Sequence, residues 1–162
     1  MGEIKIPKNP KEITNHWLAE ALRESGRLKD AKIVNHAVQT FEIGIGWANI
    51  VRISVEYDPP VEGAPSSMIS NFVSVKKIPH AEKLMDFSDT EANFYTHLGS
   101  NSGISVTQCF YADIDMQTGD YLLLMEDMSK CRVGDLSGNL EDVETGIRLV
   151  ARFHAKWWNC GN

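Results

Sequence analysis

The order of apolar and polar residues along the chain predicts three strands in its first half. In residues 47–57, apolar side chains occur at every second position, which is typical of a strand with one buried face: Val51, Ile53, Val55 and Tyr57. A second strand is expected over residues 32–43. A third is expected over residues 68–78, after a proline-rich loop at residues 58–67, and Pro79 ends it because proline cannot donate a hydrogen bond to a neighbouring strand.

Two further strands are predicted over residues 104–114 and 121–125. The residues between them suit a tight hairpin, because glycine accepts positive φ angles and short polar side chains bond to nearby backbone: Gln117, Thr118, Gly119 and Asp120. We therefore predict an α+β fold with a five-stranded, mostly antiparallel sheet, one internal helix and a helix at each end.

Apolar residues at helical spacing mark the two terminal helices. The first is capped by Thr14 or Asn15 and ends at Gly26, and its apolar stripe is Trp17, Leu18, Ala21 and Leu22. Asn139 caps the last helix, in which apolar residues recur every three or four positions: Leu140, Val143, Ile147, Val150, Phe153 and Trp157.

The internal helix is predicted to begin at Ser88, because Ser88 and Glu91 have the spacing of a capping box. Gly99 ends it. Five of its residues share one side: Phe87, Glu91, Phe94, Tyr95 and Leu98. The resulting division is a lobe over residues 1–128 that contains the sheet, followed by a connector and one helix of a second lobe over residues 129–162.

Composition favours a globular domain with an acidic surface. The chain has 162 residues, of which 43% are hydrophobic and 23% charged. Sixteen Lys and Arg against 22 Asp and Glu give a net charge of −6, which repels phosphate backbones and anionic lipids. Nucleic acid and membranes are therefore not expected partners.

Cysteine usage favours the cytoplasm. The three cysteines, Cys109, Cys131 and Cys160, are widely spaced and form neither a disulfide framework nor a zinc motif. The amino terminus has no apolar signal region, and no stretch approaches the roughly 18 apolar residues that a membrane helix needs. No metal site is expected within this chain.

A glycine pair, a lysine and a glutamate form a plan for holding nucleotide phosphates. Gly44 and Gly46 lack a Cβ, so their backbone could pass close over a phosphate and point N–H groups at it. Val51, seven residues after Gly44, is where the pattern G-x-G-x-x-G-x-V places an apolar lid over adenine. Lys76 is the expected phosphate ligand, and Glu91 the residue that would orient it.

The strand that ends near Met125 runs into a candidate hinge at Glu126, Asp127 and Met128. There, backbone groups of Glu126 and Met128 could hydrogen-bond the edge of adenine.

The glycine pattern G-x-G-x-x-G is incomplete in this sequence, because Asn49 stands at the third glycine position. Asparagine tolerates the left-handed backbone region better than most residues, so it replaces glycine here at a smaller cost than most residues would.

With these motifs in this order, the chain resembles the amino-terminal lobe of the aminoglycoside phosphotransferase and choline kinase-like superfamily, and most closely its ecdysteroid kinase-like branch. The matching stretches are residues 41–52 around the glycines, V-K-x-I-P at 75–79, F-x-x-E-x-x-F-Y at 87–95, L-L-L-M-E-D-M at 122–128 and the helix at 150–158. The resemblance implies a fold like the N-terminal lobe of a protein kinase. It also implies a kinase that transfers the γ-phosphate of ATP to a hydroxyl on a small molecule.

The catalytic half of that family pattern is missing from this sequence. None of the five histidines is followed two residues later by aspartate, so there is no H-x-D loop and no later aspartate to hold magnesium. Phosphoryl transfer then loses most of its electrostatic stabilisation. We expect no catalytic residue in this chain and no activity from it alone, with magnesium bound only when a carboxy-terminal lobe is present.

Structural interpretations compete with each of these assignments. A G-x-G sequence also occurs in ordinary tight turns, and Lys76 and Lys77 could be lysines that protect an edge strand. The two lysines point to opposite faces of a regular strand, so a register error of one residue would exchange them. Glu91 could serve only as the cap of its own helix, and His154 could be a packing residue.

A second hypothesis is a non-enzymatic, kinase-like module that binds a protein partner. The last helix would then matter most, because its apolar stripe has no predicted covering element within the chain. We expect either that this helix folds back on the sheet or that two chains pair through it as a homodimer, and we favour pairing.

Overall fold

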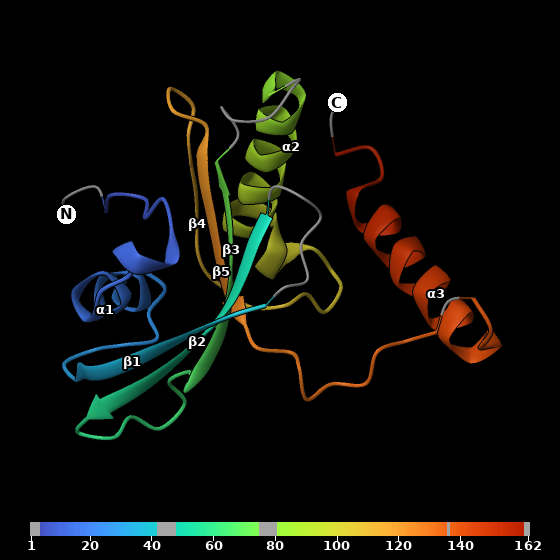
Figure 1. Ribbon diagram of the computed structural model, residues 1–162. Coiled ribbons are helices and arrows are strands. Elements are labelled where there is room, and N and C mark those ends of the chain that lie inside the picture. The colour runs from blue at the N-terminus through green and yellow to red at the C-terminus, as the bar shows by residue number, and fades with distance from the viewer. Residues whose placement is uncertain (1–3, 42–47, 75–80, 136, 161–162) are drawn as a thin grey trace.

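The computed structural model describes residues 4–41, 48–74, 81–135 and 137–160. Three helices and five strands follow one another in the predicted order (Figure 1). Their bounds are α1 Asn15–Glu24, β1 Lys32–Thr40, β2 Ala48–Asp58, β3 Ser67–Ser74, α2 Ala81–Asn93, β4 Cys109–Asp115, β5 Asp120–Glu126 and α3 Leu140–Trp157. Within these residues, no helix combines the length and apolar character needed to cross a lipid bilayer.

The five strands form one sheet in the order β1-β2-β3-β5-β4, and every neighbouring pair is antiparallel. The α+β class and the antiparallel sheet are therefore confirmed. Gly119 has a φ of 68° in the β4–β5 turn, as a tight hairpin requires. The predicted strand over residues 104–114 begins later than expected, because regular pairing with β5 starts only at Cys109.

One face of the sheet is covered by α1, which lies on the opposite side from α2 (Figure 1). The side chain of Thr14 caps α1 by accepting a hydrogen bond from the Trp17 backbone N–H, and Gly26 follows the helix with a φ of 73°. The buried residues at this face form the larger core, which includes Leu18, Leu22, Val51, Ile53, Met68, Phe72, Leu122 and Leu124.

The opposite face packs against α2 through a smaller cluster of Val73, Ala92, Tyr121 and Leu123. The predicted start of this helix is wrong, because α2 begins at Ala81 and Ser88 is a buried residue within it. The predicted apolar side is also wrong in part, since Phe87 is 66% exposed. Beyond Asn93 the helix widens into a π-helical turn at Phe94–Leu98, which ends before Gly99 as predicted.

The last helix, α3, begins after Asn139, whose side chain accepts the backbone N–H groups of Glu141 and Asp142. Its second half touches the end of the α2 segment. The Phe153 ring lies edge-on to Phe94, with centroids 6.3 Å apart. The helix therefore folds back only along part of its length.

The outward face of α3 is apolar and exposed, through Leu140, Ile147, Val150 and Trp158.

The connector before α3 is tied to the helix by Asp142, which accepts hydrogen bonds from Arg132 Nη1 at 2.8 Å and from the Asp135 backbone N–H at 2.8 Å. Bonds to Arg132 and Asp135 hold the pKa of Asp142 down, at about 2, so this carboxylate is ionised at neutral pH.

Candidate functional site

A cavity of about 460 Å³ lies on the α2 side of the sheet, where β2, β3 and the end of β5 meet the chain that follows. We call it the hinge cavity. A single rung of the sheet forms part of its wall, because Arg52 pairs with Ile69 and Ile69 pairs with Met125. The complete lining is Phe41, Ile50, Arg52, Ile69, Thr107, Met125, Glu126, Asp127, Met128 and Ser129.

Most of this lining is apolar, and its polar contacts centre on Asp127. Asp127 Oδ2 accepts hydrogen bonds from Arg52 Nε at 2.9 Å and from Ser67 Oγ at 2.5 Å. Its other oxygen accepts the Ser129 backbone N–H at 3.0 Å. One carboxylate thus joins β2, β3 and the chain after β5 at the edge of the cavity.

The carboxylate of Asp127 is held in its charged form. Burial alone would raise its pKa, but the hydrogen bonds from Ser129 and Ser67 and the positive charge of Arg52 outweigh burial and hold the pKa well below its usual range. The guanidinium of Arg52 also lies over the ring of Phe41, 5.1 Å from its centroid. Arg52 is therefore restrained from two sides.

Three of the predicted phosphate-binding residues, Gly44, Gly46 and Lys76, lie outside the described residues, as does Lys77. Val51 is fully buried in the core on the α1 side, so it does not line the hinge cavity. Its neighbour Ile50 does, because successive side chains of a strand point to opposite faces. Ile50, and not the predicted Val51, therefore lines the cavity.

Glu91 neither caps a helix start nor lines the hinge cavity. It lies within α2, and its carboxylate accepts a hydrogen bond from the Tyr121 hydroxyl at 2.9 Å. Burial and the nearby Glu91 raise the pKa of Tyr121, so this hydroxyl keeps its proton and donates it in the bond. Glu91 therefore ties α2 to β5.

The two predicted hinge residues, Glu126 and Met128, both line the cavity. The structure brings them together with Ile50 and Ile69, which lie far away in the sequence. Sequence reasoning missed the roles of Arg52 and Asp127. One available signal was the strand alternation, since Arg52 stands two positions after Ile50 and so shares its face.

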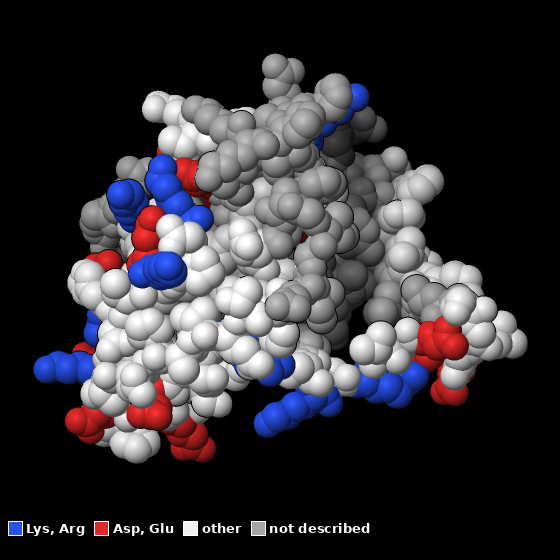
Figure 2. Space-filling view, viewed as in Figure 1, with Lys and Arg blue, Asp and Glu red and all other residues white. Residues whose placement is uncertain are grey.

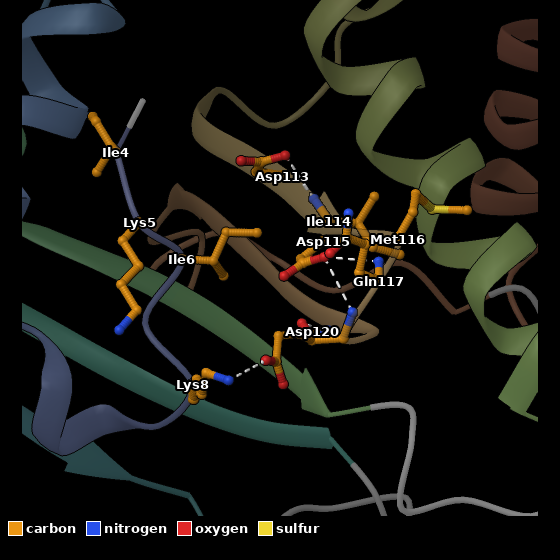
Figure 3. Close-up of a pocket in the computed structure, with 11 residues that line it drawn as sticks. Ile4, Lys5, Ile6, Lys8, Asp113, Ile114, Asp115, Met116, Gln117 and Asp120 are labelled. Atoms are coloured by element: carbon orange, nitrogen blue, oxygen red, sulfur yellow. Dashed lines mark hydrogen bonds and ion pairs between the residues drawn. The ribbon is translucent and has the colours of Figure 1, made fainter. Parts of the chain in front are cut away.

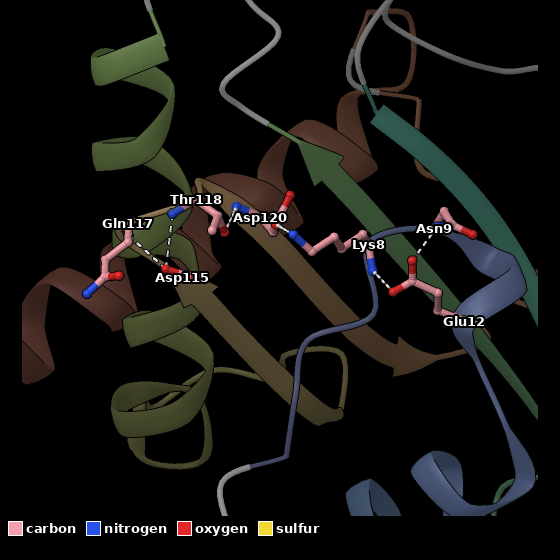
Figure 4. A network of polar contacts seen from close by, with 7 residues as sticks. All are labelled: Lys8, Asn9, Glu12, Asp115, Gln117, Thr118 and Asp120. Carbon is pink, nitrogen blue, oxygen red and sulfur yellow. Dashed lines mark hydrogen bonds and ion pairs between the residues drawn. The ribbon is translucent and has the colours of Figure 1, made fainter.

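A larger cavity of about 690 Å³ lies between the N-terminal segment and the β4–β5 turn (Figure 3). Its polar groups bind one another. Lys8 Nζ lies 2.9 Å from Asp120 Oδ2, and Asp115 Oδ1 accepts the backbone N–H groups of Gln117 and Thr118 at 2.7 and 3.1 Å (Figure 4). These contacts stabilise the turn and hold the N-terminal segment against it.

A metal ion has no evident site in the described part of the chain, where no three potential ligands converge. The apolar lining of the hinge cavity is of the kind that could hold the planar base of a nucleotide. No protein-family model matches this chain, and no curated protein matches it either.

Proposed function

We propose that this chain is the ATP-binding lobe of a small-molecule kinase, which transfers the γ-phosphate of ATP to a hydroxyl group. The observation that carries the proposal is the hinge cavity. Residues from the strand after the glycine pair, from the strand before the lysine and from the predicted hinge line one apolar space: Ile50, Ile69, Glu126 and Met128. This is the order of parts in the kinase-like lobe that the sequence resembles.

In this proposal the base lies between the side chains of Ile50 and Ile69, and backbone groups of Glu126 and Met128 bind its edge. The phosphates extend toward Gly44 and Gly46 and are bound by Lys76. In this proposal Glu91 would orient that lysine, and its carboxylate also accepts a hydrogen bond from the Tyr121 hydroxyl. The protein would act in the cytoplasm, which agrees with cysteines that form no disulfide.

Transfer of the phosphoryl group requires a catalytic base and magnesium ligands, and this sequence does not contain the motifs that supply them. Without an H-x-D loop there is no base beside the acceptor hydroxyl, and without acidic ligands magnesium cannot neutralise the developing charge. The described residues could bind and orient the nucleotide. Transfer of the phosphoryl group would need a second lobe.

ATP should bind weakly to this chain, because the lobe offers base contacts and a lysine but no magnesium ligands. We expect a dissociation constant in the high micromolar range or weaker, about 4 to 6 kcal/mol of binding free energy. Isothermal titration calorimetry with and without magnesium measures this. Sub-micromolar binding that depends on magnesium would contradict the proposal.

Lys76→Ala should remove most of this binding, while Lys77→Ala leaves it intact, because neighbouring strand residues face opposite ways. The same titration of ATP into both variants measures the difference. A loss at Lys77 instead of Lys76 would mean that Lys77 is the phosphate ligand and that the expected strand register is wrong by one residue.

The second candidate function is a kinase-like module that binds a protein partner through α3. The observation that favours it is the exposed apolar face of that helix, where Leu140 is 81% and Ile147 65% exposed. The partner that fits this face best is a second copy of the chain, because acidic residues near the start of α3 could lie beside basic residues near the end of the other copy's α3. The two functions do not exclude each other, since the hinge cavity and the outer face of α3 share no residue.

A further inference from the structure

Arg52 brings unused hydrogen-bond donors to the wall of the hinge cavity. Its Nε–H group donates to Asp127 at 2.9 Å. Among the described residues, that bond is the only one made by the guanidinium, so Nη1 and Nη2 keep four N–H groups for another partner. The rest of the wall near Arg52 is apolar and includes Ile50, Ile69 and Met125.

The charge of Arg52 is balanced within the protein. Asp127 is ionised and its side chain is 9% exposed, so the negative charge sits next to the guanidinium in a place that water reaches poorly. A phosphate in the cavity would be attracted by Arg52 and repelled by Asp127 at a similar distance. The pair therefore suits a neutral acceptor atom better than an anionic one.

The guanidinium is also preorganised. Asp127 fixes it at one edge, and the ring of Phe41 lies against its plane at 5.1 Å from the centroid. A donor that is already fixed loses little side-chain entropy when a ligand binds. This favours recognition by Arg52 over a role for it as a mobile surface charge.

We propose that Arg52 is a specificity-determining residue, which donates a hydrogen bond to a neutral acceptor on the nucleoside part of the nucleotide. The acceptor is a ring nitrogen of the base or a hydroxyl of the ribose. This inference rests on the proposed function, because it takes the occupant of the cavity to be a nucleotide. Asp127 is the positioning residue that holds Arg52 in place and cancels its charge.

The test compares four probes by NMR titration of the ¹⁵N-labelled chain: ATP, adenosine, adenine and inorganic triphosphate. In Arg52→Met we expect ATP and adenosine to bind about 10-fold more weakly, the usual effect of losing one hydrogen bond from a charged donor. Triphosphate should bind as before. Adenine weakens by the same factor if the acceptor is on the base, and is unaffected if it is a ribose hydroxyl.

Two further variants separate recognition from folding and from net charge. Arg27→Met removes an exposed arginine in the turn after α1, so it makes the same change in charge away from the cavity and should bind all probes normally. The double variant Arg52→Met with Asp127→Asn leaves no unpaired carboxylate, and it should show the same loss of adenosine binding as Arg52→Met alone.

Three other results of these titrations would contradict either the role of Arg52 or the proposed function. Weaker triphosphate binding with unchanged adenosine binding would make Arg52 a phosphate ligand and overturn the inference. Unchanged binding of all probes by Arg52→Met would overturn it as well, and would leave the proposed ATP site standing. If the unmodified chain binds adenosine but gains nothing from the phosphates of ATP, the proposed function fails while the role of Arg52 survives.

Discussion

Phe72→Ala is expected to lower the free energy of unfolding by about 4 kcal/mol, the usual cost of replacing a buried phenylalanine with alanine. Phe72 lies in the middle strand of the sheet and is 1% exposed. It pairs with Asn49 and Leu122 on the neighbouring strands, and its ring belongs to the core beneath α1. The cavity left behind cannot be filled without moving strands on both sides.

Urea unfolding followed by circular dichroism measures this loss, and the thermal midpoint should fall by about 10 °C or more. The matched control is Phe87→Ala in α2, whose side chain is 66% exposed. This second phenylalanine should cost less than about 0.5 kcal/mol, as surface substitutions usually do. Equal losses at the two positions would mean that the core is not where the structure puts it.

The chain is expected to dimerise through α3 at micromolar concentration, and Ile147→Glu is expected to weaken that association about 100-fold, since an apolar side chain at the centre of the contact is replaced by a charge. The apolar face of α3 runs through Leu140, Ile147, Val150 and Trp158. Trp158 is 75% exposed, so the helix does not bury this face against its own sheet.

Charge favours a second copy of the chain, in antiparallel orientation, as the partner. The first half of α3 carries the exposed residues Glu141 and Glu144, and acidic side chains gather at that end of the helix in Figure 2. From its middle onward the helix carries Arg148, Arg152 and Lys156. Antiparallel pairing places the acidic half of each helix beside the basic half of the other, and it also opposes the two helix dipoles favourably.

Analytical ultracentrifugation across a concentration series tests this dimer. Thr145→Glu provides the control, because Thr145 is exposed on the same helix but lies on the side opposite Ile147, so the added charge should leave association unchanged. A monomer at all concentrations, or an equal effect of the two substitutions, would show that α3 does not pair with itself.

The elements that sequence reasoning located correctly depend on neighbours along the chain. The side chains of Thr14 and Asn139 cap backbone groups two or three residues away. In β2, apolar and polar residues alternate at consecutive positions, so the sequence shows this pattern without any knowledge of the fold. The start of α2 was misplaced because Ser88 and Glu91 satisfy the spacing of a capping box while packing continues the helix back to Ala81. The spacing of a capping box is therefore not sufficient to mark the start of a helix.

Among the candidate site residues, Glu126 and Met128 lie where the sequence placed the hinge, because the end of a buried strand is a local feature. Val51 was assigned to the cavity from its spacing after Gly44. Strand spacing gives the alternation of faces but not which face is covered by which helix. That choice depends on how α1 and α2 pack, and it places Ile50 instead of Val51 at the cavity.

The sequence by itself determined the α+β class, the order of the elements and the apolar stripe of α3, because periodicity and capping are encoded within a few residues. Only the tertiary structure decided the partners of side chains that are distant in sequence. Arg52 meets Asp127 and Glu91 meets Tyr121 across 75 and 30 residues. Such pairs form only when the strands and helices pack together and remove both groups from water, so no local sequence pattern predicts them.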